Sequence, residues 1–443
     1  MSSRQSIALR LLLFTLCIAP ATVLCGGAEP RKYFGKFLHL TDIHFDPTYR
    51  TNASVTQFCH RASDSGALAQ TFGTLGSLCD APVALVESSF EYLKQQHQDI
   101  DFVLYTGDSV RHDRDPGKAR TSQDVIYDHQ RVTEYFHKTF DLNKVKVIPA
   151  FGNVDPFMYD QVKEGPSQEL STLLALWKSL GLKLDESFLK GGYYTATIIP
   201  GRLEVISLNT NFFYKKNREV LGCEDGSNSP GLKQLLWLQR ILETAIVDNT
   251  KVYIIGHIPP HDAQGNIAYY ESCHRKFAYL LGKHSDIVLA SFFGHTNVDS
   301  ISYVFSAMNE YGINNLSDHM PSSHPGTESI LGIIYTAPSI IPFRNPAMRK
   351  LSYVSRTDQA QAIGQISDYT QYYVDLDRAN REGRLMYDVE YVASTAYKVE
   401  NLSTESWQTI LADFRKPGSP TWEAYQRYRE VSPRKPYQLV IQQ

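Results

Sequence analysis

Six short apolar runs constrain the fold of this chain more than any other feature of its sequence. Each run is rich in β-branched and aromatic residues and is stopped by glycine, asparagine, aspartate or proline, which is typical of short buried β-strands. The runs cover residues 36–42, 100–108, 144–153, 203–211, 251–260 and 286–295. Amphipathic stretches of helical period lie between them, at residues 82–97, 122–138, 167–179 and 231–246. Strands alternating with helices predict an α/β fold with largely buried sheets.

The runs fall within one predicted main domain, residues 32–343. The following region, residues 344–443, is rich in tyrosine and charge and is predicted to form a small C-terminal subdomain packed on the first. The chain has 443 residues, of which 42% are hydrophobic, so it can bury a large core. Its net charge of −3 gives no sign of nucleic-acid binding, and any polyanionic ligand must be held by local charge.

The first 25 residues are predicted to be a secretory signal rather than part of the fold. Two arginines precede a 15-residue apolar run that Pro20 interrupts, and this is shorter than the ~20 residues needed to span a bilayer. An uncleaved signal anchor is the alternative. Since no later segment is long and apolar enough to cross a membrane, we expect no stable span after cleavage. The predicted location is a vacuole-like or lysosome-like lumen, or the extracellular space.

Four cysteines remain after the signal segment, and an even number in an exported chain favours two disulfides. The four are Cys59, Cys79, Cys223 and Cys273. Pairing nearest neighbours gives Cys59–Cys79 and Cys223–Cys273, although three connectivities are possible and zinc ligation competes without support from a CxxC pair. Three Asn-x-Ser triplets are candidate glycan acceptors, consistent with the secretory route. Their asparagines are Asn52, Asn315 and Asn401.

Oxygen and imidazole donors follow five of the six runs. They are Asp42 and His44, Asp108, Asn153, His257, and finally His295 and Asn297. Asp42 and His44 are two residues apart, so in extended chain both point to the same side. In α/β sheets ligands gather beyond the carboxyl ends of the strands, so donors far apart in sequence can converge. Glycine lies beside the donor in four of the five cases, where the backbone must turn sharply. The conjunction of these motifs predicts a metal site.

The order of the motifs resembles that of the calcineurin-like metallophosphoesterases, whose signature runs Asp-x-His, Gly-Asp, Gly-Asn-His, a lone His, and Gly-His-x-His. The resemblance implies a β-sandwich flanked by helices that holds two divalent metal ions, Mn, Mg, Co or Zn. By the same match, Asp42, His44 and Asn297 bind one ion, Asn153, His257 and His295 bind the other, and Asp108 bridges both.

Longer stretches resemble the acid-sphingomyelinase-like branch of that family, at residues 59–93, 106–115 and 335–349. Within the branch, "GNVD" and "GHTNVD" are most similar to the fungal vacuolar endopolyphosphatases. The resemblance implies hydrolysis of phosphoanhydride bonds inside inorganic polyphosphate by a hydroxide shared between two metals. The alternative is a phosphodiesterase acting on sphingomyelin or nucleotide phosphates. A third hypothesis, a catalytically silent binder of phosphorylated ligands, is disfavoured because the donors are retained.

Two positions depart from the wider family's pattern. Asn297 replaces a histidine, and an amide oxygen is an adequate ligand for Mn, Mg or Co but weaker than imidazole for Zn. Val154 replaces the histidine beside the reacting phosphate, so another acid is needed for the leaving oxygen. We predict that His112 is this acid and that it is oriented by Asp113, within a catalytic set completed by Asp108 and Asn153. The alternative is that His112 only caps a turn.

A polyphosphate substrate requires positive charge along its groove, because each internal unit carries about one negative charge. Cationic side chains occur beside two of the predicted strand ends. The predicted substrate contacts are Arg111, Arg114, Lys215 and Lys216. The alternative is that these cations are merely solvated surface.

Overall fold

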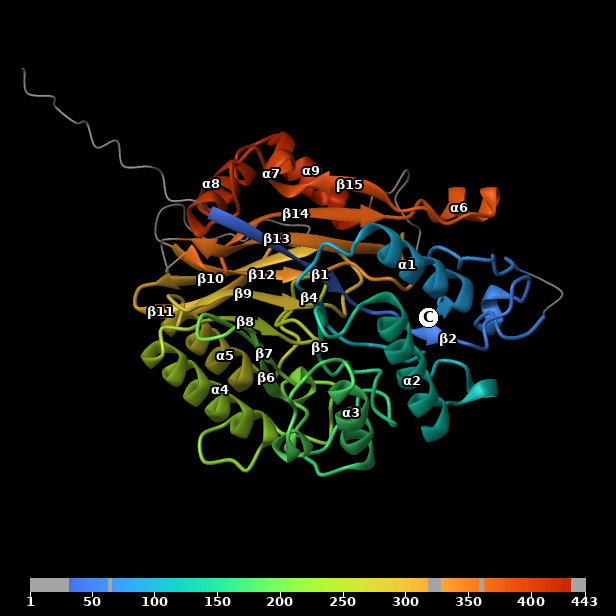
Figure 1. Ribbon diagram of the computed structural model, residues 1–443, viewed down its shortest axis with the longest axis horizontal. Coiled ribbons are helices and arrows are strands. Elements are labelled where there is room, and N and C mark those ends of the chain that lie inside the picture. Colours follow the sequence, from blue (N-terminus) through green and yellow to red (C-terminus); the bar gives the residue numbers. More distant parts are fainter. Residues whose placement is uncertain (1–31, 63–65, 318–327, 358–361, 432–443) are drawn as a thin grey trace, which may run out of the picture.

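The computed structural model describes residues 32–62, 66–317, 328–357 and 362–431. The predicted signal segment lies outside these residues. Two β-sheets pack face to face, with helices outside them (Figure 1). In the described part of the chain, no helix has the length and apolar character needed to cross a bilayer.

The first sheet has six strands and mixed directions. In spatial order they are β15 (Asp388–Val392), β14 (Ile366–Tyr373), β13 (Ala347–Thr357), β1 (Lys32–Leu40), β4 (Phe102–Tyr105) and β5 (Lys146–Pro149). Strands β1, β4 and β5 run parallel. Strand β13 runs antiparallel to β1, with Phe37 opposite Leu351. The region from Arg344 onward therefore extends the sheet of the predicted main domain through three strands, in addition to packing on it.

The second sheet has seven strands, four of which run parallel. In spatial order they are β11 (Glu310–Asn315), β10 (Ser300–Ala307), β12 (Ser329–Thr336), β9 (Val288–Phe293), β8 (Lys251–Ile255), β7 (Leu203–Ser207) and β6 (Tyr194–Ile199). The parallel set is β12, β9, β8 and β7. A small third sheet pairs β2 (Phe45–Asp46) with β3 (Ala81–Pro82). All six predicted strands are confirmed, because each apolar run overlaps one strand of the two large sheets.

The helices cover the outer faces of the sheets, and the four predicted ones are confirmed. They are α1 (Val83–Gln96), α2 (Ser122–Thr139), α3 (Gln168–Lys178) and α4 (Pro230–Val247). Helix α2 begins where the sequence provides a capping box, in which Thr121 and Asp124 each bind the other's backbone N–H. The helices that the sequence analysis did not predict are α5 (Glu271–Lys283), α6 (Leu376–Glu382), α7 (Ala393–Tyr397), α8 (Thr404–Phe414) and α9 (Pro420–Arg429).

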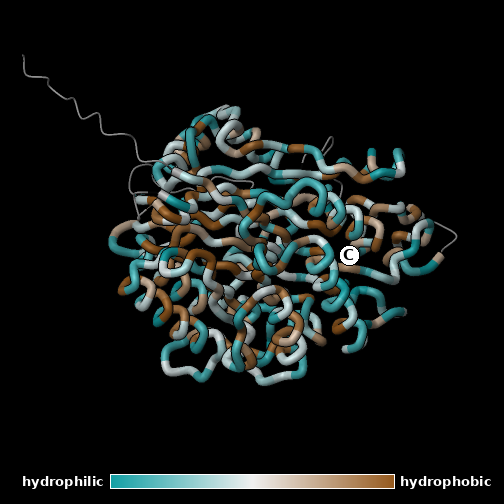
Figure 2. The backbone as a smooth tube through the Cα atoms, in the orientation of Figure 1, coloured by the Kyte–Doolittle hydropathy of each residue, from teal (hydrophilic) through white to brown (hydrophobic). Residues whose placement is uncertain are grey.

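Aromatic side chains fill the space between the two sheets. The ring of Phe37 in β1 lies 4.6 Å from that of Phe102, 5.8 Å from that of Tyr253 in β8 and 5.6 Å from that of Phe292 in β9. All four side chains are buried. Figure 2 shows hydrophobic stretches along the central strands and more hydrophilic residues along the outer loops. This shared core fixes the two sheets relative to each other, and so fixes the edge at which their parallel strands end.

Both predicted disulfides are confirmed, with the nearest-neighbour pairing. Cys59 is bonded to Cys79, and Cys223 is bonded to Cys273. The zinc alternative for these cysteines is therefore excluded, because their sulfur atoms are bonded in pairs.

Candidate metal centre

Parallel strands of both sheets end at one edge of the molecule, and the predicted donors lie there. They follow β1, β4 and β5 of the first sheet and β8 and β9 of the second. Three groups of potential ligands form in the described residues, each with its ligand atoms within 4.8 Å of one another, and two of them consist only of predicted donors. These two groups are Asp42, His44 and Asp108, and Asp108, His257 and His295. Because Asp108 belongs to both groups, the edge has the arrangement expected of two cations that share one carboxylate.

The donors near the second cation position converge closely. The side-chain oxygen of Asn153 lies 2.8 Å from Nε2 of His257 and 2.8 Å from Nδ1 of His295. Nε2 of His257 also lies 3.0 Å from Oδ2 of Asp108. The other ring nitrogen of His257 lies 2.7 Å from the carbonyl oxygen of Thr106, which orients the ring. Loops after four strands, β4, β5, β8 and β9, thus present four donors to one point.

The donors near the first cation position include Asn297. Nε2 of His44 lies 3.5 Å from Oδ1 of Asp42 and 3.4 Å from Oδ2 of Asp108. Nδ1 of His44 lies 3.1 Å from the carbonyl oxygen of Val110, so Nε2 is the nitrogen left for a ligand role. The side-chain oxygen of Asn297 is buried and accepts no hydrogen bond within the described residues. An amide oxygen can therefore complete this position.

Burial and charge show that the residues present fit cations. Asp42 and Asp108 are almost fully buried, and in the described part of the chain neither forms a salt bridge with lysine or arginine. Oδ1 of Asp42 accepts no hydrogen bond there. Two buried carboxylates without a side-chain cation of fixed charge require positive charge from elsewhere. The donor set of carboxylate, imidazole and amide suits divalent metal ions.

The pKa shifts in the centre have the same electrostatic origin. Burial lowers the pKa of His257, but Asp108 and Asp42 outweigh it and raise that pKa to about 9. Burial opposes ionisation of Asp42, yet His44 and His257 hold its pKa well below the usual range. Burial, followed by repulsion from His257, lowers the pKa of His295 to about 3. The carboxyl group of Asp42 is therefore ionised near neutral pH, and its field favours any positive charge placed beside it.

Most of these donors have an unusual backbone conformation. Asp42, His44, Asp108, His295 and Asn297 have φ values of 52°, 45°, 59°, 70° and 57°. Such left-handed conformations are uncommon for residues other than glycine, and they concentrate at functional sites. The prediction that Asp42 and His44 share a side because the chain is extended is therefore wrong. They converge because the chain turns tightly after β1.

Glycines allow the donors to approach the backbone of neighbouring loops. A Cβ on Gly152 would lie 2.1 Å from Oδ1 of Asp108, and a Cβ on Gly294 would lie 1.9 Å from the hydroxyl of Thr41 and 2.5 Å from Oδ2 of Asp42. At these two positions glycine therefore allows close approach, and not the sharp turn that was predicted.

Asp155 holds the loops after β4 and β5 together, and the sequence analysis did not identify it. Its carboxylate accepts hydrogen bonds from the backbone N–H groups of Asp108, Ser109 and Gly152, at 3.1, 2.7 and 2.8 Å. The N–H of Val154 donates to Oδ1 of Asp108 at 2.9 Å. Position 154 thus supports the bridging carboxylate through its backbone, which any residue except proline supplies. The only sequence signal was the position of Asp155 in "GNVD".

His112 lies beside the first cation position. Its ring stacks on that of His44, with centroids 4.1 Å apart and planes 12° apart. Asp80 lies 2.7 Å from Nδ1 of His112 and accepts the backbone N–H of the same residue at 2.6 Å. Asp113, the predicted orienting residue, is exposed and accepts the N–H of Arg120 instead. The prediction for Asp113 is wrong, because the side chain next in sequence points away while a carboxylate from another loop reaches the ring.

Three further polar side chains lie beside Asn153, His112 and His295. Asp160 accepts a 2.7 Å hydrogen bond from the Asn153 amide nitrogen, which leaves the amide oxygen facing His257 and His295. The ring of Tyr159 lies 6.0 Å from that of His112, and the ring of Tyr214 lies 5.5 Å from that of His295. The positions of Tyr159 and Tyr214 follow from the folded loops.

The four predicted substrate contacts occupy different environments. Arg111 is buried, and its guanidinium donates to the carbonyl oxygens of His112 and Lys118. Lys215 is exposed and donates to the carbonyl oxygen of Ile267. Arg114 is half-buried near His112, whose pKa its positive charge helps to lower.

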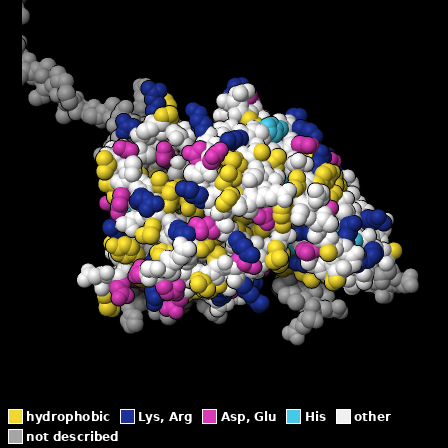
Figure 3. Space-filling view, turned by 90° about the horizontal axis from the view of Figure 1, so that it is seen from below, with side chains coloured by type: hydrophobic (Ala, Val, Ile, Leu, Met, Phe, Trp, Pro, Cys, Tyr) yellow, Lys and Arg dark blue, Asp and Glu magenta, His cyan; other side chains and the backbone are white. Residues whose placement is uncertain are grey.

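Lys216, the last of the four predicted substrate contacts, lies near His295, whereas Arg114 lies near His112. It is exposed, its Nζ lies 5.8 Å from the centroid of the Tyr214 ring, and its charge acts on His295 and Asp160. The face seen in Figure 3 mixes cationic and anionic side chains without a patch of one sign. Near the centre, positive charge is supplied by Arg114 beside His112 and by Lys216 beside His295.

The candidate glycan acceptors also differ in exposure. Asn52 and Asn401 are exposed. Asn315 is half-buried in β11, and its amide donates to the hydroxyl groups of Ser300 and Ser302. A glycan on Asn315 would have to break both hydrogen bonds, so the structure favours Asn52 and Asn401.

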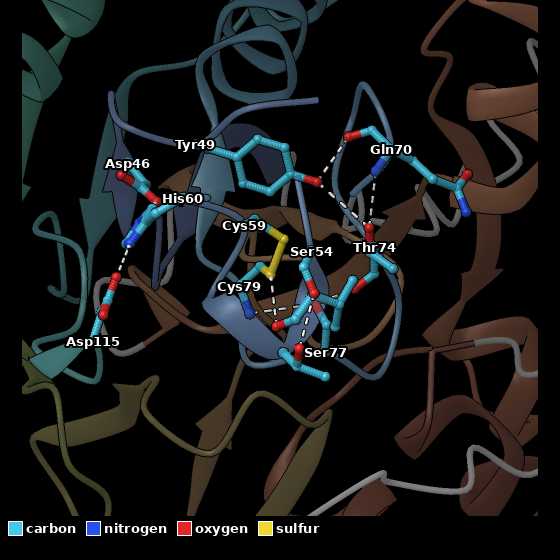
Figure 4. The surroundings of a disulfide bond; sticks show 12 residues. Asp46, Tyr49, Ser54, Cys59, His60, Gln70, Thr74, Ser77, Cys79 and Asp115 are labelled. Atoms are coloured by element: carbon cyan, nitrogen blue, oxygen red, sulfur yellow. Dashed lines mark hydrogen bonds and ion pairs between the residues drawn. A yellow bond between two sulfur atoms is a disulfide. The ribbon is translucent and has the colours of Figure 1, made fainter. Parts of the chain in front are cut away.

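His60 connects the first disulfide loop to the loops of the centre (Figure 4). It follows Cys59 directly, and its ring lies 2.9 Å from Asp46 through Nε2 and 2.6 Å from Asp115 through Nδ1. Arg61 also pairs with Asp115, at 2.7 and 2.8 Å. Burial lowers the pKa of His60, but its hydrogen bonds to the two aspartates outweigh burial and raise the pKa. The charged ring therefore ties together two segments that flank His44 and His112.

We expect His60 to make stability depend on pH. Because its pKa is raised on folding, its contribution is complete below about pH 6.5, the value for a free imidazole, and is lost as pH rises through the folded-state pKa. The difference in free energy of unfolding between the native chain and His60→Gln should therefore shrink above neutral pH, measured by denaturant titration. His137→Gln, at an exposed position, is the control. A difference that stays constant from pH 6 to pH 10 would contradict this role.

The family that this chain matches is consistent with the potential metal ligands described above. A model described as calcineurin-like phosphoesterase matches residues 35–299, which is more than half of the chain. The chain belongs to this family. It is a metallophosphoesterase, a hydrolase of phosphate bonds, and the family uses divalent metal ions. A second model, acid sphingomyelin phosphodiesterase C-terminal region, matches residues 333–437 and places the chain in the acid-sphingomyelinase-like branch.

Similar curated proteins have two different names. The human cyclic GMP-AMP phosphodiesterase SMPDL3A is 31% identical, over 94% of this chain and 86% of its own length. The endopolyphosphatase of Yarrowia lipolytica is 33% identical, over 61% of this chain and 42% of its own length. The endopolyphosphatase of Kluyveromyces lactis is 34% identical, over 63% of this chain and 42% of its own length. The chain thus spans less than half the length of these two endopolyphosphatases.

Proposed function

We propose that this protein is an endopolyphosphatase, which hydrolyses phosphoanhydride bonds inside inorganic polyphosphate chains with two divalent metal ions. The observation that carries the proposal is a cation near each end of the donor set, Arg114 near His112 and Lys216 near His295. A polyphosphate chain carries negative charge on both sides of the bond to be cleaved, so it needs cations on both sides. Similarity to named endopolyphosphatases supports the same substrate class.

In this proposal the donor residues hold the metal pair. Asp42, His44, Asn297 and the shared Asp108 would hold one ion, and Asn153, His257, His295 and Asp108 would hold the other. Bound divalent ions would lower the pKa of a water so that hydroxide is available to attack phosphorus, and would supply positive charge for the phosphoryl oxygens. The choice among Mn, Mg, Co and Zn stays open, although the amide at position 297 favours the first three.

The protein itself supplies orientation and a proton. Asp160 orients the amide of Asn153, and the Thr106 carbonyl orients the ring of His257. His112 presents Nε2, which makes no hydrogen bond within the described residues, as the group that protonates the leaving oxygen. Burial and the charge of Arg114 lower the pKa of His112 to about 3. A bound phosphate chain brings negative charge beside the ring and so favours its protonated form.

A phosphodiesterase acting on nucleotide phosphates is the second candidate. The similarity to the human protein named cyclic GMP-AMP phosphodiesterase covers nearly the whole of this chain and most of that protein. The exposed aromatic ring of Tyr159 beside His112 could stack on a base, which favours a nucleotide over a lipid diester.

The deciding experiment compares four substrates side by side. Metal-reconstituted protein is incubated with long-chain polyphosphate, cyclic GMP-AMP, sphingomyelin and ATP, and the polyphosphate products are sized on a gel. Chains of intermediate length are expected early in the reaction. Release of terminal phosphate alone would refute mid-chain cleavage, and turnover of cyclic GMP-AMP without polyphosphate cleavage would establish the second candidate.

Lys216 should contribute to the recognition of long chains more than Lys215 does. Lys216→Glu is expected to raise KM for long-chain polyphosphate about 5- to 10-fold, which corresponds to ~1–1.4 kcal/mol from reversing one exposed charge. Chains of a few units should be affected less. Lys215→Glu is the matched control, because Lys215 is directed to the Ile267 carbonyl. Equal effects of the two substitutions would contradict a specific role for Lys216.

We also propose that the protein acts in an oxidising compartment of the secretory route, such as a vacuole-like lumen. Its two disulfides support this location, since disulfides persist in such compartments and are rare in the cytosol. Exposed triplets at Asn52 and Asn401 are consistent with passage through that route.

A further inference from the structure

The first disulfide loop ends in a carboxylate that contacts the proposed acid. Asp80 follows Cys79 directly and lies 6% exposed. One of its oxygens accepts the backbone N–H of His112 at 2.6 Å, and the other lies 2.7 Å from the ring nitrogen Nδ1. A carboxylate accepts only, so Nδ1 carries the hydrogen and Nε2 is the nitrogen that faces away from Asp80.

Asp80 is held in place on both sides. Before it, Cys79 is bonded to Cys59 (Figure 4). After it, strand β3 pairs with β2, and the N–H of Ala81 donates to the carbonyl oxygen of His44 at 3.0 Å. The segment that carries Asp80 is therefore bound directly to the segment that carries a predicted metal ligand. This anchoring fixes Asp80 relative to the centre, which a carboxylate on a free loop would not achieve.

We propose that Asp80 is the positioning residue for His112, fixing its ring orientation and tautomer so that Nε2 can give a proton to the leaving oxygen. This inference rests on the proposed hydrolase function. In the step concerned, a bond forms between water oxygen and phosphorus while the bond from phosphorus to the leaving oxygen breaks. The proton on Nε2 of the charged ring passes to that leaving oxygen, and Nδ1 keeps its hydrogen on Asp80.

A metal-ligand role is the competing explanation for Asp80. His44, Asp80 and His112 place ligand atoms within 4.8 Å of one another. However, the rings of His44 and His112 are stacked 12° from parallel, so their in-plane lone pairs do not converge on one point. Both oxygens of Asp80 are already engaged by His112. The geometry therefore points to an Asp–His pair beside the metal centre and not to a third metal position.

The test compares Asp80→Asn with Asp113→Asn in the full chain. The substrates are bis(4-nitrophenyl) phosphate, whose leaving group departs without a proton, and diphenyl phosphate, whose leaving group needs one. Asp80→Asn is expected to lower kcat for the phenyl ester about 10²-fold, within the range for loss of acid catalysis, with little change for the nitrophenyl ester or in KM. Asp113→Asn should resemble the native protein, since Asp113 is exposed and bonded to Arg120.

Three results would overturn the role of Asp80. They are equal losses on both esters, loss of a bound metal ion from Asp80→Asn by elemental analysis, and an unchanged His112 tautomer. The tautomer is read by ¹⁵N-histidine NMR, with His112→Ala identifying the signal among the 14 histidines. Native protein should show hydrogen on Nδ1, and Asp80→Asn should lose this preference. Because the NMR measurement needs no turnover, it tests Asp80 even if the native protein cleaves neither polyphosphate nor the esters, a result that would refute the proposed function alone.

Discussion

Replacing Asp108 by asparagine is expected to reduce phosphohydrolase activity by at least about 10³-fold, the upper end of the cost of removing one stabilising group. Asp108 is the residue shared by the two groups of potential ligands that consist only of predicted donors. Asparagine has the same shape and can still accept the N–H of Val154, so the loops should keep their fold. The change removes one negative charge and the oxygen that lies 3.0 Å from His257.

Activity and metal content should be measured together for this variant. We expect loss of both ions, or of one, by elemental analysis, with a denaturation midpoint close to that of the native apo-protein. Asp113→Asn is the control, since it removes an exposed carboxylate of the same loop without touching the donors. Retention of two ions with substantial activity would show that Asp108 does not bridge the metals.

Replacing Asp155 by alanine is expected to lower the free energy of unfolding by about 4 kcal/mol. The carboxylate accepts three backbone N–H groups while almost fully buried. Each hydrogen bond to a charged acceptor contributes ~1.5–3 kcal/mol, and part of this is recovered if water enters. The measurement is equilibrium unfolding in denaturant with the disulfides intact.

Asp155→Asn should lie between alanine and the native chain, because an amide offers one accepting oxygen instead of two. Asp113→Ala should cost well under 1 kcal/mol, as expected of an exposed position. A cost for Asp155→Ala similar to that for Asp113→Ala would show that the three hydrogen bonds do not hold the loops together.

The secondary structure around the centre could be predicted because its signals are local. Each predicted strand is a continuous apolar run ended by a turn residue, and helix α2 begins at a capping box. Helix α5 was missed although it buries Cys273, Phe277 and Leu281 at four-residue spacing. The strand β13 could not be placed, because its pairing with β1 joins residues more than 300 positions apart.

The convergence of the predicted donors could be foreseen for a related reason. Parallel strands must end at a common edge, so polar residues at their ends converge whatever the length of the connections. The residues that support the donors could not be predicted in this way. Asp80 reaches His112 across 32 positions, and Asp155 reaches Ser109 across 46. Neither spacing has a period that a sequence pattern reveals.

The sequence by itself determined six of the strands, four of the helices, and the residue types gathered at one edge, while it favoured nearest-neighbour pairing of the cysteines among three possible connectivities. These follow from hydrophobic periodicity and turn chemistry, which act over a few residues. Only the tertiary structure decided which carboxylate orients His112, which cations face the centre, and how the last strands join the first sheet. Those contacts depend on the packing of distant segments, because a hydrogen bond is set by distances of a few tenths of an ångström that spacing along the chain does not specify.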